Sequence, residues 1–387
     1  MTLQIPISEN YPHFLWRALK HPREALRAMR RLDKMPGFVW IEVTNRCNLR
    51  CRSCSKFYGL HDSNTDMDLG LFNQILDAVS PSAHTVNLTG IGEFFFHKQV
   101  DRIWERLAER PHIDLWITTN GKLIDEDWIR RLAERRCRVI FSIDGVDQKT
   151  HAFNRPGGDL GKLVLALERA RALELASPDP ASFPFKRYIN FLVMRNNMDQ
   201  MPEMVEWGAK YAVGDLRFTL MNNWGCSQDF WREQNPLNYR GELIALIQES
   251  RRIAAEKGVF LIAPAVRPAP PESPPSEAGN PRRGAGALRF FRPSAATAQG
   301  LPRFEDRFCR HPFTSIYFSV DGKASICCAS WGTVLGDIRR QTLDEIWNGL
   351  PFRRIRAGMA VGSHTSFCRA CDLPDGLAKG NPRDGTA

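Results

Sequence analysis

The sequence has no uninterrupted apolar run of the roughly 20 residues that a membrane-spanning helix requires. Its first ten residues, MTLQIPISEN, have neither the basic segment nor the apolar stretch of a secretory signal. We therefore expect a cytoplasmic protein without a membrane span. The hydrophobic share of 43% and the charged share of 25% are ordinary for globular proteins, which excludes fibrous, collagen-like and wholly disordered classes.

The chain also lacks a dense basic tract interleaved with aromatic residues. Lys and Arg number 53 against 43 Asp and Glu, which gives a formal charge of +10, but the excess is spread along the chain. We therefore expect no nucleic-acid partner. A length of 387 residues allows one large domain and a smaller one.

Ten cysteines are present, and in a reducing compartment their spacing indicates metal binding or catalysis rather than disulfides. Cys137 and Cys226 have no cysteine neighbour, and we expect Cys137 to pack in the core because free cysteine is among the most buried residue types. The others form two groups: Cys47, Cys51 and Cys54, then Cys309, Cys327, Cys328, Cys368 and Cys371.

Strand-like and helix-like segments alternate from residue 38 onward. Six apolar strands joined by amphipathic helices predict a parallel sheet that is covered by helices and buried on both faces. About 190 residues in six units favour an α/β fold of the partial (β/α)6 barrel type over a complete eight-fold barrel. The expected strands are residues 38–43, 84–89, 113–118, 138–143, 188–194 and 215–221.

Composition divides the chain into four segments. Residues 1–37 form a basic helical extension, expected to pack over the domain with its Lys/Arg face in water; a membrane surface or an acidic partner is the alternative. Residues 38–263 form the barrel. Residues 264–306, rich in proline, predict a flexible linker. Residues 307–387 form a small α+β module with a hairpin at Asp321-Gly322 and a helix at TLDEIWNGL.

Polar residues follow all six predicted strands, at the edge where parallel βα folds place their active sites. Each segment alone is an ordinary turn, but six on one rim favour a site. In chain order they are the three-cysteine segment, Gly90-Ile91-Gly92-Glu93, Thr119-Asn120-Gly121, Ser142-Ile143-Asp144, Arg195 with Asn196, and Asn222 with Asn223.

Cys47, Cys51 and Cys54 are too few for a closed zinc site, which requires four ligands. A cubane iron–sulfur cluster held by only three thiolates keeps one iron open to another ligand. The alternative is a structural site whose fourth ligand is His61 or a distant cysteine. Spacing alone leaves both possibilities open.

The segment Glu42-Val43-Thr44-Asn45-Arg46-Cys47-Asn48-Leu49-Arg50-Cys51-Arg52-Ser53-Cys54 resembles the cluster loop of radical S-adenosylmethionine (SAM) enzymes, with their Cys-x3-Cys-x2-Cys signature. Residues 90–93 resemble that family's Gly-Gly-Glu-Pro element. Residues 119–121 are similar to its third-strand segment, and residues 142–144 to its ribose-contacting motif. The resemblance spans roughly residues 38–222. It departs at Ser53, where many members have an aromatic residue, and in the sequence Gly-Ile-Gly-Glu-Phe.

This resemblance implies a [4Fe–4S] cluster on the three cysteines, with an open iron that chelates the methionine moiety of SAM. Reductive cleavage would then yield a 5′-deoxyadenosyl radical that abstracts hydrogen from a substrate C–H, with electrons from a flavodoxin- or ferredoxin-type donor. The implied SAM contacts are Gly90, Gly92, Glu93, Asn120, Ser142 and Asp144. Arg195 is a candidate for the methionine carboxylate because a guanidinium offers bidentate donors; the alternative is a solvated loop arginine.

Near the C-terminus, Cys309, Cys327, Cys368 and Cys371 supply four thiolates. Taken alone, a zinc ribbon is a serious alternative. Beside the barrel motifs, the module resembles the SPASM/twitch extension of radical SAM enzymes, which implies one auxiliary [4Fe–4S] cluster. Cys328 stands next to Cys327 and is an alternate ligand.

A fully ligated second cluster suggests an oxidative reaction. Three hypotheses follow: a radical oxidoreductase acting on a small molecule such as a sugar, cyclitol or aminoglycoside-like intermediate, a radical enzyme that modifies a peptide or protein, and a non-enzymatic iron–sulfur or zinc regulator. The first is favoured slightly over the second because 37 residues before the first strand are few for a peptide-recognition domain.

Overall fold

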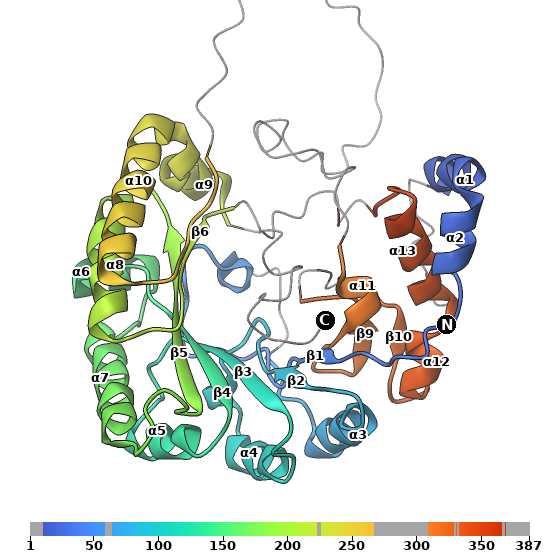
Figure 1. The fold of residues 1–387 in the computed structure, drawn as a ribbon, viewed down its shortest axis with the longest axis horizontal. Helices are drawn as coiled ribbons and strands as arrows, with labels where there is room; N and C mark the ends of the chain where they lie inside the picture. The colour runs from blue at the N-terminus through green and yellow to red at the C-terminus, as the bar shows by residue number, and fades with distance from the viewer. Residues whose placement is uncertain are drawn as a thin grey trace, which may run out of the picture.

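The computed structural model describes residues 11–58, 64–222, 226–266, 309–328, 330, 333–365 and 368. Ten strands in these ranges form one sheet in the order β10-β9-β8-β1-β2-β3-β4-β5-β6-β7 (Figure 1). The strands from β1 to β7 are parallel neighbours. They are β1 Phe38–Ile41, β2 Thr85–Asn87, β3 Asp114–Thr119, β4 Cys137–Ser142, β5 Phe185–Val193, β6 Leu216–Leu220 and β7 Leu261–Ile262.

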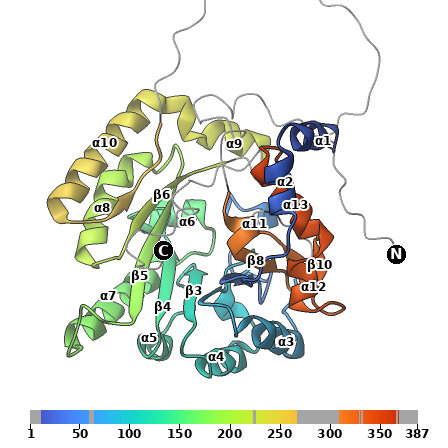
Figure 2. The same ribbon diagram turned by 45° about the vertical axis from the view of Figure 1, so that its right-hand side comes forward.

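The helices between these strands cover the outer face of the curved sheet (Figures 1 and 2). Several begin at an aspartate whose carboxylate accepts a backbone N–H of the first turn, as Asp68 does from Leu71. None of the helices in the described ranges is long and apolar enough to cross a membrane. The helices are α3 Leu69–Val79, α4 Val100–Ala108, α5 Glu126–Ala133, α6 Gln148–Asn154, α7 Leu160–Ala176, α8 Met201–Lys210, α9 Gln228–Gln234 and α10 Arg240–Lys257.

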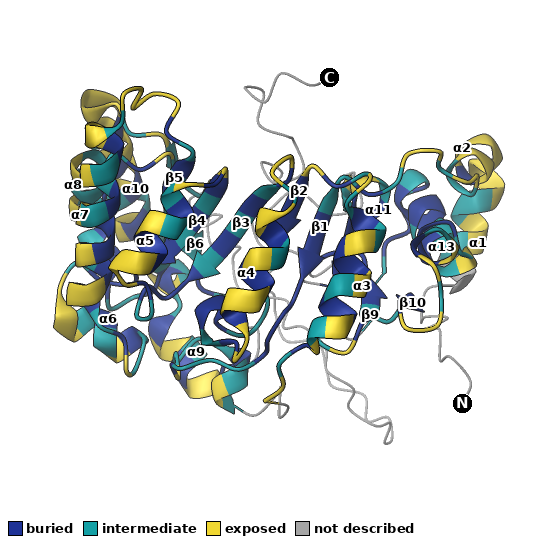
Figure 3. Ribbon diagram, turned by 90° about the horizontal axis from the view of Figure 1, so that it is seen from below, coloured by how far each residue is buried: buried dark blue, intermediate teal, exposed yellow. Residues whose placement is uncertain are grey.

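The two faces of the sheet are buried to different degrees. In β5 fully buried residues alternate with half-buried ones along the whole strand, and β3 shows the same alternation. Phe185, Ile189 and Phe191 face the helices, and Figure 3 shows the inner sides of those helices as buried. The expected burial of both faces is therefore confirmed at β2 and at three of the four residues of β1, but it is wrong at β3 and β5. At β3 and β5 the concave face is only half-buried.

The C-terminal module extends the same sheet. Strand β8 (Ser315–Phe318) pairs in parallel with β1, and β9 (Lys323–Ser325) and β10 (Gly336–Asp337) continue antiparallel. The hairpin at Asp321-Gly322 is confirmed, with Gly322 in the left-handed region at φ 81°. Helices α11 (His311–Thr314), α12 (Leu343–Trp347) and α13 (Leu350–Ala360) complete the described module.

The N-terminal extension forms two short helices, α1 (Tyr11–Lys20) and α2 (Pro22–Ala28), which lie against α13 rather than over the barrel (Figure 1). Polar contacts with the C-terminal module hold the segment that follows them. Nη2 of Arg31 donates to both carboxylate oxygens of Asp344, at 2.8 and 2.9 Å. The backbone N–H of Leu32 donates to the side chain of Asn348, and the indole of Trp347 donates to the carbonyl of Lys34.

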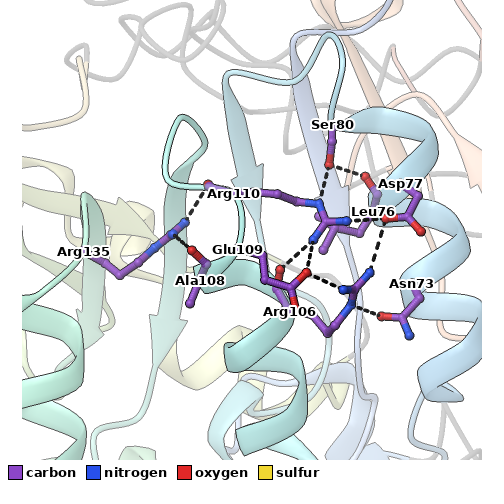
Figure 4. Close-up of polar contacts among 9 residues, drawn as sticks. All are labelled: Asn73, Leu76, Asp77, Ser80, Arg106, Ala108, Glu109, Arg110 and Arg135. Atoms are coloured by element: carbon purple, nitrogen blue, oxygen red, sulfur yellow. Dashed lines mark hydrogen bonds and ion pairs between the residues drawn. The ribbon is translucent and has the colours of Figure 1, made fainter.

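An arginine network joins helices α3 and α4 where they lead back to the amino ends of the strands (Figure 4). Arg106 donates to Asn73 at 3.0 Å, and Arg110 donates to Ser80 at 2.9 Å and also pairs with Asp77. Buried Arg135 donates to the carbonyl oxygens of Ala108, Arg110 and Ile113. Cations near helix C-termini are favourable, so this edge is built for stability.

The continuous sheet predicts that barrel and module unfold together. Phe318 in β8 is fully buried, so Phe318→Ala should lower the free energy of unfolding by about 3–5 kcal/mol. Urea denaturation followed by circular dichroism and tryptophan fluorescence should show one shifted transition. Phe260→Ala is the matched control, because that side chain is 57% exposed and its loss should cost less than about 0.5 kcal/mol. Separate transitions for the two parts would contradict this.

Candidate active site

The cysteine loop, residues 44–54, leaves the carboxyl end of β1. The backbone N–H groups of Arg50 and Arg52 donate to the carbonyls of Pro156 and Asn154, which fixes the loop against the segment after α6. Cys47, Cys51 and Cys54 are all half-buried. Burial raises the pKa of the Cys47 thiol to about 11 and that of Cys51 to about 12. Such thiols bind iron with release of their protons.

Within the described residues, no three His, Cys, Asp or Glu side chains are arranged to hold one metal ion together. A cubane cluster does not require that arrangement, because each thiolate binds a different iron. The buried amide nitrogen of Asn48, next to Cys47, has no acceptor. A cluster sulfur accepts such hydrogen bonds, so the donor set of this loop fits a cubane. His61, the alternative fourth ligand, lies outside the described residues.

The Gly90–Glu93 segment lies directly against the cysteine loop. The backbone N–H of Glu93 donates to the carbonyl of Arg46 at 2.8 Å. A Cβ at Gly92 would overlap the carbonyl oxygens of Thr44 and Arg46, and a Cβ at Gly90 would overlap the side chain of Glu42. Both glycines are therefore required by close approach and not by backbone conformation.

Glu93 is buried, and its carboxylate is bound within the protein. It accepts a hydrogen bond from the Thr119 hydroxyl and another from the Asn120 backbone N–H, each at 2.8 Å. The Asn120 side chain in turn donates to Asn48 at 2.8 Å. Burial raises the pKa of Glu93 to about 7. The structure thus brings the ends of β2 and β3 and the cysteine loop together.

A buried ion pair connects the end of β4 with the cysteine loop. Asp144 is fully buried, and one of its oxygens accepts from Nε of Arg155 at 2.6 Å. The other accepts from the backbone N–H of Leu192 at 3.1 Å. Arg155 also donates to the Cys51 sulfur at 3.7 Å, and the nearby anions raise its pKa despite burial. Ser142, two residues before Asp144, is also buried.

Arg155 carries no functional signal in the sequence, because it precedes Pro156 in what resembles an ordinary turn. The predicted candidate, Arg195, lies elsewhere. Its guanidinium forms a 3.2 Å ion pair with Glu242 and stacks over the ring of Tyr239. Its side chain is thus directed toward the segment after β6 rather than toward the cysteine loop.

The cysteines of the C-terminal group come from three places in the module. Cys309 precedes α11, Cys327 and Cys328 follow β9, and Cys368 follows α13. Cys327 is buried against Trp40 and Tyr317, and its backbone N–H donates to the Ser330 hydroxyl. Cys328 is half-buried, and Cys371 lies outside the described residues.

The remaining two cysteines lie in apolar surroundings. Cys137 is 2% exposed and belongs to the main core, so its expected packing role is confirmed. Cys226 is buried among Met194, Met221 and Phe230. Asn223, expected at the rim, lies outside the described residues.

Residues 41–208 match the family model of the radical SAM superfamily, so the chain contains a radical SAM domain. Residues 309–372 match the SPASM iron–sulfur cluster-binding domain. The chain thus combines a radical SAM domain with a SPASM domain, and these domains imply SAM and [4Fe–4S] clusters, including an auxiliary cluster, as its cofactors.

Two curated relatives are similar over part of the chain. The tungsten-containing aldehyde ferredoxin oxidoreductase cofactor-modifying protein of Pyrococcus furiosus is 27% identical over 176 residues, which are 44% of this chain and about half, 47%, of that protein. GTP 3′,8-cyclase of Syntrophomonas wolfei is 27% identical over 235 residues, 59% of this chain and 68% of that enzyme.

The fold is also that of a solved enzyme. Streptococcus suis SuiB bound to S-adenosylmethionine superposes with a TM-score of 0.60 at 16% identity, covering 90% of this chain and 74% of SuiB. The partial barrel and the small C-terminal module are thereby confirmed.

Gly92→Ala should displace the cysteine loop, because the new Cβ meets two backbone carbonyl oxygens that cannot rotate away. We expect a loss of about 1–3 kcal/mol in the free energy of unfolding, measured by urea denaturation. We also expect reduced iron content after anaerobic reconstitution. Gly241→Ala is the matched control: it lies in α10 with open space around the new Cβ, so stability should stay equal or rise slightly. Equal behaviour of the two variants would show that the close approach does not matter.

Proposed function

We propose that this enzyme is a radical SAM oxidoreductase that oxidises a small polar molecule and passes the second electron to its auxiliary cluster. The observation that carries the proposed SAM site is the buried Asp144–Arg155 pair, which places a guanidinium beside Cys51. When bound, the cluster and SAM supply a one-electron cleavage that yields 5′-deoxyadenosine and removes a hydrogen atom from a substrate C–H bond.

In this proposal Cys47, Cys51 and Cys54 hold the first cluster, and Gly90, Gly92 and Glu93 present backbone groups to the methionine moiety. Asn120, Ser142 and Asp144 lie along the same edge. Arg155 replaces Arg195 as the partner of the methionine carboxylate. Asp144 orients Arg155 through a 2.6 Å hydrogen bond, and the guanidinium is largely withdrawn from water, which strengthens its attraction to a carboxylate.

The concave face supports a small polar substrate. It carries hydrogen-bonding side chains on or just after four strands, β2, β3, β5 and β6: the Thr89 hydroxyl donates to Thr118 at 2.9 Å, and the Thr219 hydroxyl donates to Asn190 at 2.7 Å. All four side chains are half-buried. Paired hydroxyl and amide groups suit a hydroxylated ligand. The relative GTP 3′,8-cyclase is also named for a small polar substrate.

The proposed oxidation balances with one SAM consumed. An alcohol carbon loses a hydrogen atom to the deoxyadenosyl group, then loses an electron to the auxiliary cluster and a proton from its hydroxyl, and becomes a carbonyl. Cys309, Cys327, Cys368 and Cys371 would hold that cluster. A flavodoxin- or ferredoxin-type protein would supply the electron that starts each cleavage. This scheme explains why a second cluster accompanies the barrel.

Anaerobically reconstituted protein should contain about eight iron atoms per chain, because two cubanes hold four each. On reduction it should convert SAM to 5′-deoxyadenosine, measured by chromatography, and Cys51→Ala should abolish this. Cleavage that persists in Cys51→Ala would rule out the first site. About four iron atoms with one zinc would instead rule out the auxiliary cluster.

The same assay separates the substrate classes. A small-molecule ultrafiltrate should increase the rate of 5′-deoxyadenosine formation more than a peptide fraction of the same cells. The opposite result would favour a peptide substrate. SuiB, whose fold this chain shares, has been solved with its precursor peptide SuiA.

Arg155→Lys should weaken SAM binding about tenfold or more. Lysine lacks the planar guanidinium that can bond to Asp144 and to the methionine carboxylate of SAM at the same time. Isothermal titration of reconstituted protein with SAM measures this. Arg195→Lys is the matched control and should bind SAM as the wild type does. If Arg195→Lys weakens binding and Arg155→Lys does not, the carboxylate site lies at Arg195.

A further inference from the structure

Glu42 is a buried carboxylate at the end of β1, with 4% of its surface exposed. It accepts a hydrogen bond at 2.8 Å from the backbone N–H of Ile91, in the middle of the Gly90–Glu93 segment. On the C-terminal module, its backbone N–H donates to the carbonyl of Phe318 at 2.9 Å, and the Tyr317 hydroxyl and the backbone of Val320 lie near its carboxylate. One side chain therefore joins two parts of the enzyme that lie more than 200 residues apart in sequence.

On the barrel side, Glu42 determines the path of the loop. A Cβ at Gly90 would overlap Cγ and the carboxylate of Glu42, so the backbone at this point lies directly on the acid. The same loop bonds to the cysteine loop through Glu93 and Arg46, at 2.8 Å. A shift of Glu42 would therefore move the backbone that faces the first cluster.

On the module side, Glu42 is held by β8. Tyr317 is 3% exposed and lies opposite Trp40 in the β1–β8 register. Its ring packs with Trp40 and Cys327. A single tyrosine thus lies between the Glu42 carboxylate and a cysteine of the auxiliary group.

No lysine or arginine of the described residues forms an ion pair with Glu42, so its carboxylate depends on neutral donors such as the Ile91 amide. An acceptor buried in this way is sensitive to the loss of any one donor. Removing the hydroxyl of Tyr317 should therefore change how firmly Glu42 holds Ile91.

We propose that Glu42 is a positioning residue that couples the auxiliary-cluster module to the SAM-binding loop, with Tyr317 as its contact on the module. Docking of the module against the barrel then favours the loop conformation that binds SAM, and SAM binding in turn favours the docked module. The link to SAM rests on the proposed function of residues 90–93. The mechanical link between Tyr317 and Ile91 does not.

The test compares Tyr317→Phe with wild-type protein in two measurements. Isothermal titration of reconstituted protein with SAM should show a dissociation constant raised about fivefold or more, although Tyr317 lies in the other module. Hydrogen–deuterium exchange of the unreconstituted chain should show faster exchange of the Ile91 amide, since its acceptor is loosened. Glu42→Gln should give both effects, and the double variant should be no worse than Glu42→Gln alone, because the tyrosine acts through the acid.

Tyr211→Phe is the matched control, since Tyr211 is also 3% exposed but lies at the end of α8. It should alter thermal stability at most, without an effect on SAM affinity or Ile91 exchange. If Tyr317→Phe behaves like this control, the coupling is refuted and Tyr317 is merely structural. If wild-type protein fails to bind SAM, the proposed SAM site is wrong, and Ile91 exchange alone then decides whether Glu42 couples the two parts.

Discussion

The register of β1 is the constraint on which the rest of the structure depends. This strand is hydrogen-bonded on both edges, so that Phe38 lies opposite Thr85 in β2 and Ser315 in β8. Side chains alternate along a strand, and a slip of one residue would exchange the two faces. Val39 and Ile41 would leave the core and Trp40 would enter it. The orientation of Glu42 and the start of the cysteine loop are therefore set by the packing of Val39 and Ile41 in the core.

The buried charges of the site are not explained by stability. Replacing a buried ion pair by apolar side chains of similar volume is often neutral or stabilising, because desolvation offsets much of the attraction. Asp144 and Arg155 nevertheless lie together in the interior, and Arg155 reaches the Cys51 sulfur. An arginine in this place counters negative charge that thiolates bring when they bind iron. The pair is thus better explained by compensation of charge at the proposed first cluster than by stabilisation of the fold.

Much of the fold and of the candidate site could be predicted from the sequence because the sequence signals for them are local. The apolar runs at 113–118 and 138–143 coincide with β3 and β4, and Asp321-Gly322 forms the turn that its residue types favour. Contacts between distant segments have no such signal. Arg155 resembles a loop residue until folding places it beside Cys51, and nothing near Glu42 indicates Tyr317. Strand β7 has only two residues, which are too few to show the alternation of apolar and polar side chains that indicates a strand.

The same register also determines how the two cysteine groups are separated. Because β8 is parallel to β1, its carboxyl end lies at the edge of the sheet where the cysteine loop begins, while Cys309 precedes its amino end. Strand β9 runs back, so Cys327 also lies toward the opposite edge. The four residues of β8 span about 13 Å, which separates these two edges.

The Arg31–Asp344 pair and the Trp347–Lys34 hydrogen bond also attach the module to the segment a few residues before β1. Rotation of the module would break both attachments, so the separation between the two groups is fixed by the sheet and not by the proline-rich connection.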